Sequence, residues 1–207
     1  MSHELETGTG LFVGQPAWHG LGKVFAVAPD VDTCYVESGL NTFVDLEPVY
    51  LSTPIERDGA TILDTRCVEG QFAVVRRHDR QMYGIVGADY RVLQNIDMFN
   101  WFRPIIESGQ ATIEAAGSLK GGRRVWVLAA VKDAQADIVP GDTVKHYVLL
   151  AHSHDGSLSI KAGFTSVRVV CQNTLSAALG RKASKLLNVR HTAGAKLTLD
   201  KIRNAFD

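Results

Sequence analysis

Short β-rich runs separated by turn residues dominate the sequence, and this pattern restricts the chain to a sheet built mainly from hairpins. The turns fall at Asp58 and Gly59, at His78 and Asp79, at 120–124, and at Asp155 and Gly156. Glycine tolerates the positive φ of tight hairpin turns, and runs rich in Val, Ile and aromatic residues lie on either side. We therefore predict an α+β fold with an antiparallel, hairpin-rich sheet and helices packed on one side of it.

Helical spacing appears in three places. Within 96–109 the large apolar residues recur three and four positions apart, which is typical of an amphipathic helix. We predict a second helix over 175–187, weakened in its middle by Gly180. A third helical pattern begins near residue 195 and stops without a cap, which indicates a truncated helix.

Length and composition favour one domain. The 207 residues, 45% of them hydrophobic, are enough for a proper core. We expect a single α+β domain over 1–207 whose first 40 or so residues form an irregular arm, held on the body by Phe12, Trp18 and Phe25. No apolar run approaches the roughly 20 residues that cross a bilayer. The three cysteines include no closely spaced pair, which favours a reduced, cytoplasmic setting.

The zero net charge hides two oppositely charged parts. Residues 1–117 carry 8 Lys or Arg against 16 Asp or Glu, whereas residues 118–207 carry 14 against 6, so the net charges are −8 and +8. No glutamate follows Glu114. Such a division indicates either an anionic partner for the second part or a match between acidic and basic faces within or between subunits.

The basic second part contains a candidate phosphate-binding track. Lys120, Arg123 and Arg124 surround two glycines of a predicted hairpin turn. Positive charge at such a turn gives affinity for a phosphate backbone without sequence preference. The turn matches neither of the familiar glycine-rich phosphate-binding patterns, and a solvated basic surface is the alternative. The other cations of the predicted track are Lys161, Arg168, Arg181, Lys182, Lys185 and Arg190.

The stretch VRVVCQNT at 167–174 combines several candidate roles. Arg168 lies inside an apolar run, where its guanidinium needs an acid, a carbonyl, solvent or a phosphate, so an ion pair and an anion site are both open. We expect Cys171 to be buried, although a position at the start of a helix also suits a nucleophile. Asn173 or Thr174 is the expected helix N-cap.

His152, His154 and Asp155 are the candidate metal ligands. Alternate positions of a strand share one face, so the two imidazoles can converge on one ion. Two ligands do not complete a site, however, and Asp155 is also explained by the hairpin turn. We expect no metal and no other cofactor. Trp18, in the segment WHGLG, can stack a base, but we favour its role as an anchor of the N-terminal arm.

Two sequence segments resemble a known family. PAWHGLG at 16–22, SHDGSLSIKAGFTSVRVVCQNTL at 153–175 and the helix after them are similar to the phage- and plasmid-encoded family catalogued as domain of unknown function 932. The resemblance runs from Gly14 to about Ala193 and implies a mobile-element context in a bacterial host. It also implies a further helical region after the present end. The predicted sheet is similar, as an analogy of fold, to the single-strand annealing recombinases of phages.

These features predict a non-enzymatic DNA-binding protein of a phage or plasmid, with single-strand annealing as its candidate activity. The basic track would hold the phosphates of single-stranded DNA, and the acidic first part would contact a neighbouring subunit of a homo-oligomer in the cytoplasm. No membrane contact is expected. One alternative is a hydrolase-like or metal-dependent enzyme that uses Cys171 or the cluster of His152, His154 and Asp155. Another is a host-interaction protein that binds no nucleic acid.

Overall fold

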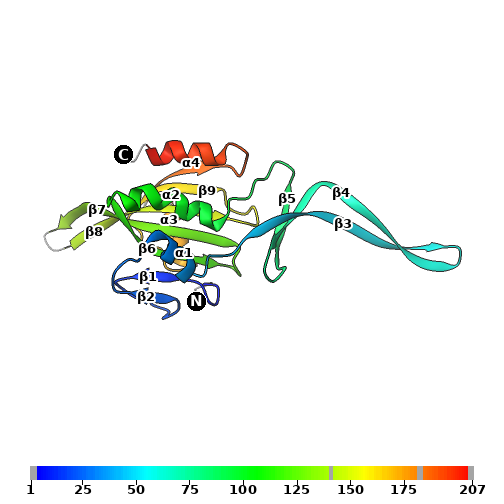
Figure 1. Cartoon of the computed structure of the whole chain (residues 1–207), viewed down its shortest axis with the longest axis horizontal. Helices are drawn as coiled ribbons and strands as arrows, with labels where there is room; N and C mark the ends of the chain where they lie inside the picture. Colours follow the sequence, from blue (N-terminus) through cyan, green and yellow to red (C-terminus); the bar gives the residue numbers. More distant parts are fainter. Residues whose placement is uncertain (1–3, 140–141, 181–183, 205–207) are drawn as a thin grey trace.

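The main body of the protein is a seven-stranded sheet (Figure 1). The computed structural model describes residues 4–139, 142–180 and 184–204, with the backbone alone at 133–139 and 142–144. The sheet order is β10-β9-β8-β7-β6-β1-β2, and all neighbours are antiparallel except β1 and β2. Its strands are β1 (Leu11–Val13), β2 (Lys23–Phe25), β6 (Ala111–Leu119), β7 (Arg124–Val139), β8 (Asp142–Ser153), β9 (Ile160–Thr165) and β10 (Ser184–Val189).

Helices cover both faces of this sheet. One face, here called the α2 face, packs against α1 (Val31–Glu37), α2 (Asn95–Glu107) and α4 (Ala195–Asn204). The opposite face, here called the α3 face, packs against α3 (Gln172–Leu179). The α+β class with a hairpin-rich antiparallel sheet is confirmed, but the helices are not confined to one side. Among the described residues no helix is both long and apolar enough to cross a membrane.

Burial on both faces explains why the central strands are apolar at successive positions. Along β7, Val125 and Val127 enter the core under α2, whereas Trp126 and Leu128 enter the core under α3. Successive side chains of a strand point to opposite faces, so a strand covered on both sides has no polar alternation. Gly117, paired with Trp126, leaves room for the indole, since a Cβ at Gly117 would lie 2.5 Å from it.

A smaller sheet of β3 (Val44–Arg57), β4 (Ala60–Arg76) and β5 (Met82–Gly87) carries a long two-stranded extension. Its turn has positive φ at both Asp58 (52°) and Gly59 (79°), as the predicted hairpin requires. β5 pairs with β4 only at 71–75, so residues 50–70, here called the arm, form an unaccompanied ribbon. The arm projects from one end of the body, and every arm residue is exposed except the half-buried Asp64 (Figure 1).

The α2 helix begins where its sequence supplies a cap. The Gln94 backbone N–H donates to Asp97 Oδ2 at 3.0 Å, and the Asp97 carboxylate stands in the first turn, where the helix dipole favours it. The predicted helix over 96–109 is therefore confirmed to within two residues. Its apolar stripe is buried, as the spacing indicates, with Met98 and Phe99 fully inaccessible. The predicted start of the last helix near residue 195 is also confirmed.

The helix predicted over 175–187 is wrong in its second half. α3 ends at Leu179, and 184–189 form β10 at the sheet edge. Gly180 ends the helix with an extended backbone (φ −73°, ψ 141°). The predicted N-cap is also displaced, because the cap is Cys171. Thr174 instead lies in the first turn of α3 and stabilises the start of the helix, since its Oγ1 accepts a hydrogen bond from the Cys171 N–H at 3.0 Å.

The first 40 residues are more regular than predicted, because they contain β1, β2 and α1. β1 lies between β2 and β6, and Phe12 is fully buried. Trp18 is 64% exposed, so its ring is not buried on the core as predicted, although its side chain hydrogen-bonds Cys171. His19 makes the anchoring contact instead, with its Nε2 3.0 Å from the Val170 carbonyl oxygen.

Candidate functional site

The basic turn at 120–124 is not a free tip, because it packs where the two sheets meet. Gly121 and Gly122 have φ of 68° and 87°, and the Lys120 N–H donates to the Glu4 carbonyl at 3.0 Å. A Cβ at Gly122 would collide with the hydroxyl of Tyr83 on β5. The two glycines therefore let the turn seat closely against the small sheet.

Arg76 of β4 holds this junction together. Its guanidinium donates to Glu6 at 3.0 Å, to both oxygens of Asp79 at 2.9 and 2.7 Å, and to Gln81. It also lies over the Tyr83 ring, 5.6 Å from the centroid. The hydrogen bond to Arg76 is the main cause that lowers the Asp79 pKa to about 2. This arginine is consequently engaged on every side and is a structural residue.

Most described cations of the second part have no acidic partner. Among the described residues, six of the eight Lys and Arg before Ser118 form ion pairs, but only three of the twelve that follow do so. These unpaired cations can therefore contact an external anion. The described cations outside any ion pair in this part are Lys120, Arg123, Arg124, Lys132, Lys145, Lys161, Lys185, Arg190 and Lys201.

The structure brings some of the predicted track together. Arg124 and Lys161 both lie on the α3 face, because Arg124 is two residues from Trp126, and the row of paired residues through Trp126 continues to Lys161. Arg190, which follows β10 directly, borders a surface hollow with Gly156 at the same strand ends. We call Lys120, Arg123, Arg124, Lys161 and Arg190 the strand-end cations. All five belong to the basic track that the sequence predicts.

Other predicted site residues lie elsewhere. Lys185 is paired with Phe164 and faces the α2 side of the sheet. Arg168 forms the ion pair that the sequence left open, with its Nε 2.9 Å from Glu114 Oε1 and its NH2 2.6 Å from the Gln15 carbonyl. Arg181 and Lys182 lie outside the described residues.

Three buried histidines form a second polar cluster under the start of α2. His152, His154 and His191 are 0%, 2% and 8% exposed. The ring centroids of His152 and His154 are 4.7 Å apart, and those of His152 and His191 are 5.4 Å apart. The predicted common face of His152 and His154 is confirmed by this contact. We call these three residues the histidine cluster.

Hydrogen bonds orient two of the three rings. Asn95 Nδ2 donates to the Leu40 carbonyl at 3.0 Å, so its Oδ1 is left to accept from His154 Nε2 at 3.0 Å. His191 Nδ1 lies 3.3 Å from the Arg91 carbonyl oxygen. Both ring nitrogens of His152 lack a hydrogen-bond partner among the described residues.

Burial keeps these histidines neutral at ordinary pH. Desolvation, followed by repulsion from the neighbouring rings, lowers the pKa of His152 well below its usual value and that of His154 to about 3. Desolvation also lowers the pKa of His191. Tyr83 stacks on His154 and Tyr90 stacks on His191, which closes the cluster with aromatic rings.

The residues of the enzyme alternative are engaged in the fold. Within the described part of the chain, no three His, Cys, Asp or Glu side chains are placed to hold a metal ion. Asp155 Oδ1 accepts from the Ser157 N–H at 2.9 Å, as a turn residue does. Cys171 is 1% exposed. Burial raises its thiol pKa, but hydrogen bonds from Thr174 and Trp18 outweigh this and bring the pKa below its usual value.

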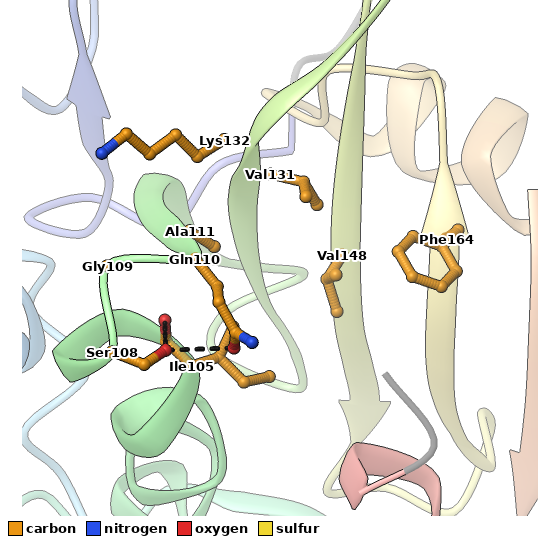
Figure 2. A pocket seen from close by; sticks show the side chains of 9 residues that line it. All are labelled: Ile105, Ser108, Gly109, Gln110, Ala111, Val131, Lys132, Val148 and Phe164. Carbon is orange, nitrogen blue, oxygen red and sulfur yellow. Dashed lines mark hydrogen bonds between the residues drawn. The ribbon is translucent and has the colours of Figure 1, made fainter. Parts of the chain in front are cut away.

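A separate apolar groove of about 440 Å³ opens where the end of α2 faces the sheet. Figure 2 shows Val131, Val148 and Phe164 on neighbouring strands, with Ile105 and the segment after α2 opposite them. Phe164 is 38% exposed. We call this the α2 groove, and it is lined by Ile105, Ser108, Gly109, Gln110, Ala111, Val131, Lys132, Val148 and Phe164.

The sequence of the body matches one known family. Residues 82–207 match the profile described as Domain of unknown function (DUF932), which spans β5, α2, the histidine cluster and the strands from β6 onward. The arm precedes the matched part. No curated protein and no solved structure matches the chain. Because the match covers more than half of the 207 residues, the chain belongs to the DUF932 family.

Proposed function

We propose that this protein binds single-stranded DNA through phosphate contacts, as a non-enzymatic protein of a phage or plasmid in the bacterial cytoplasm. The observation that carries the proposal is the set of cations after Ser118 that have no acidic partner among the described residues. Cations without internal partners can replace the counterions of a phosphate backbone, and this release supplies affinity that does not depend on sequence.

The strand-end cations are the best placed of these residues. Arg124 and Lys161 share the α3 face, two strands and two residues apart, which corresponds to roughly 12 Å by strand geometry. Arg190 lies at the same strand ends and is exposed. Adjacent phosphates of an extended strand lie several ångströms apart, so these three cations can follow one backbone. Arg168, which is paired with Glu114, is left out of this set.

The exposed indole of Trp18 supports single strands over duplex. The Trp18 side chain hydrogen-bonds Cys171, which is buried in the core under α3, so the indole lies on the same side of the sheet as Lys161. Aromatic rings stack on unpaired bases and contribute about 1–3 kcal/mol for each base. Stacking of this kind needs bases that are not already stacked in a duplex.

Salt dependence tests the proposal. We expect a fluorescent oligonucleotide to bind, with affinity falling about 50-fold between 50 and 200 mM salt if about four phosphates are neutralised. Lys161→Gln and Arg190→Gln should each lower the salt slope by about 0.7. Lys196→Gln is the matched control, because Lys196 is already paired with Asp97 at 2.8 Å. Absence of binding at 50 mM salt, or equal effects of all three variants, would overturn the proposal.

Two further measurements define the activity. Competition with duplex DNA of the same length should leave single-strand binding largely intact, and Trp18→Ala should reduce this preference. Mixing two complementary labelled strands with the protein should accelerate their pairing if the protein anneals DNA. Binding without acceleration would restrict the function to single-strand binding and remove annealing.

A further inference from the structure

We propose that the arm of one copy of this chain docks in the α2 groove of a second copy, so that subunits join head to tail. The proposal does not rest on nucleic-acid binding. It follows from four properties of the described residues: the lack of cover on the arm, the open groove, the charges of both surfaces, and their separation on the molecule.

The arm exposes apolar side chains that its own body does not cover. Tyr50, Leu51 and Leu63 are 60%, 62% and 68% exposed, and the cross-strand pair of Ile55 and Ile62 is 39% exposed at both positions. A two-stranded ribbon alone in water is marginally stable. Its unpaired edges and apolar faces also favour association with another chain. The arm therefore presents an apolar surface that another chain can bury.

The α2 groove offers an apolar floor at the surface. Ala129, Val148 and Phe164 form one row across β7, β8 and β9, and Phe164 remains 38% exposed at the end of this row. Next to Phe164, β10 adds Leu187 on the same face, and its side chain is 56% exposed. This surface and the arm both lack the polar cover that a monomer surface normally has.

The charges of the two surfaces are opposite. The arm carries four acids and two arginines, and only Asp64 and Arg66 among them form an ion pair within the described structure. Lys132 lines the groove, and Lys185 lies beside Phe164; neither has an acidic partner among the described residues. Opposite potentials steer association and select this pairing over contact between two acidic arms. The acids of the arm are Glu56, Asp58, Asp64 and Glu69.

The two surfaces lie at opposite ends of the body. The base of the arm is fixed at the start of α2, where Gln94 exchanges hydrogen bonds with the Val44 backbone at 3.1 and 2.8 Å. The groove lies at the other end of α2, about 20 Å away for a helix of 13 residues. Figure 1 shows the arm pointing away from that end. An arm therefore reaches the groove of another copy, and repetition of this contact gives a ring or an open chain.

Complementation between two defective variants tests this arrangement. In the arm variant, Ile55→Thr, Ile62→Thr and Leu63→Thr remove the apolar tip while keeping residues that favour strands. In the groove variant, Phe164→Thr removes the exposed ring. We expect wild type to be oligomeric by light scattering, each variant alone to be monomeric, and an equal mixture to form a one-to-one dimer and nothing longer. Val27→Thr, which changes an exposed apolar side chain outside both surfaces, should leave the wild-type oligomer unchanged.

Circular dichroism and thermal melting must first show that both variants are folded. In the mixture, the intact arm of the groove variant can then dock in the intact groove of the arm variant. Cross-linking gives an independent readout, because Cys67 on the arm is exposed whereas Cys34 and Cys171 are buried. A thiol-to-amine reagent should join Cys67 of one copy to Lys132 or Lys185 of another. A monomeric wild type, a groove variant that still oligomerises, or a dominant Cys67 to Cys67 product would each overturn the proposal.

Discussion

His154, which directly follows strand β8, and Asn95, in the first turn of α2, are joined by a hydrogen bond of 3.0 Å between two buried side chains. The amide of Asn95 is oriented by Leu40, so His154 donates from Nε2 while its other nitrogen stays unprotonated. A second proton on His154 would place a charge beside His152 and away from water. The fold therefore depends on a neutral histidine at this point.

Stability should fall in mildly acidic solution because of the histidine cluster. The unfolded chain binds protons near pH 6.5, whereas the folded histidines, with lowered pKa values, do not. The unfolded state then carries more protons than the folded state. The contribution of the neutral histidines to stability is therefore fully present above about pH 6.5 and is lost as pH falls toward 3. The free energy of unfolding should decrease by about 2 kcal/mol between pH 7 and pH 5 for each histidine that stays neutral.

Urea unfolding at pH 7 and pH 5 measures this loss. The decrease should be smaller in His152→Leu, which removes one titrating ring from the cluster. His78→Gln is the control, because His78 is exposed on the turn between β4 and β5. The charged and titratable groups around the cluster are Asp155, Tyr83 and Tyr90, and none of these is expected to titrate between pH 5 and pH 7. An equal decrease in His152→Leu and wild type would contradict the role of the cluster.

Arg168 should stabilise the fold rather than hold DNA. Arg168→Met leaves the half-buried carboxylate of Glu114 without its partner and frees the Gln15 carbonyl, so we expect a loss of about 2–3 kcal/mol. Adding Glu114→Gln to Arg168→Met should cost less than the sum of the single changes. Arg66→Met, in the exposed pair with Asp64, should cost less than about 1 kcal/mol. If Arg168→Met kept the wild-type stability but bound DNA more weakly, Arg168 would instead be part of an anion site.

Gly163 on β9 should tolerate no side chain, because it lies against the edge strand β10. Its φ is 151°, and a Cβ there would collide with the carbonyl oxygen of Lys185 on β10. Gly163→Ala should therefore cost about 3 kcal/mol or detach β10, since backbone cannot shift as a flexible side chain does. Gly87→Ala is the control, because Gly87 has open space around its Cβ position. Thermal unfolding of both variants would decide, and equal melting temperatures would show the contact to be unimportant.

The three cysteines should differ in reactivity. Cys67 is exposed, whereas Cys34 and Cys171 are 0% and 1% exposed, and burial raises the pKa of Cys34 to about 12. A thiol reagent should modify one site rapidly in the native protein and three after unfolding. Mass spectrometry of the labelled peptides identifies the sites. Rapid modification of Cys171 would revive the alternative that it serves as a nucleophile.

The sequence predicted the parts of the fold that depend on local signals. The turn at Asp58 and Gly59, the amphipathic helix α2 and the common face of His152 and His154 all follow from residues close together in the chain. It failed where distant residues decide. The run at 184–189 forms strand β10 because it pairs with β9, and the apolar segment β1 forms a strand because it pairs with β6.

The candidate sites show the same division. Positive charge after Ser118 could be counted from the sequence, but the faces on which Lys161 and Lys185 lie required the strand register. His191 could not be joined to His152 and His154 in advance, because no local spacing relates a residue after β10 to strand β8. The α2 groove had no sequence signal, since its lining residues come from one helix, four strands and the segment after α2.

The place of β1 in the sheet sets the order in which the chain can fold. β1 pairs with Ala115 and Ala116, about a hundred residues later, so the large sheet cannot close at this strand until β6 has been synthesised. The arm needs only its own turn and neighbouring residues, and local hairpins form faster than such distant pairings. During synthesis the nascent chain can therefore expose the apolar side chains of this marginally stable ribbon before the large sheet has formed. Its acidic residues and Pro54 lie where protection from premature aggregation is most needed.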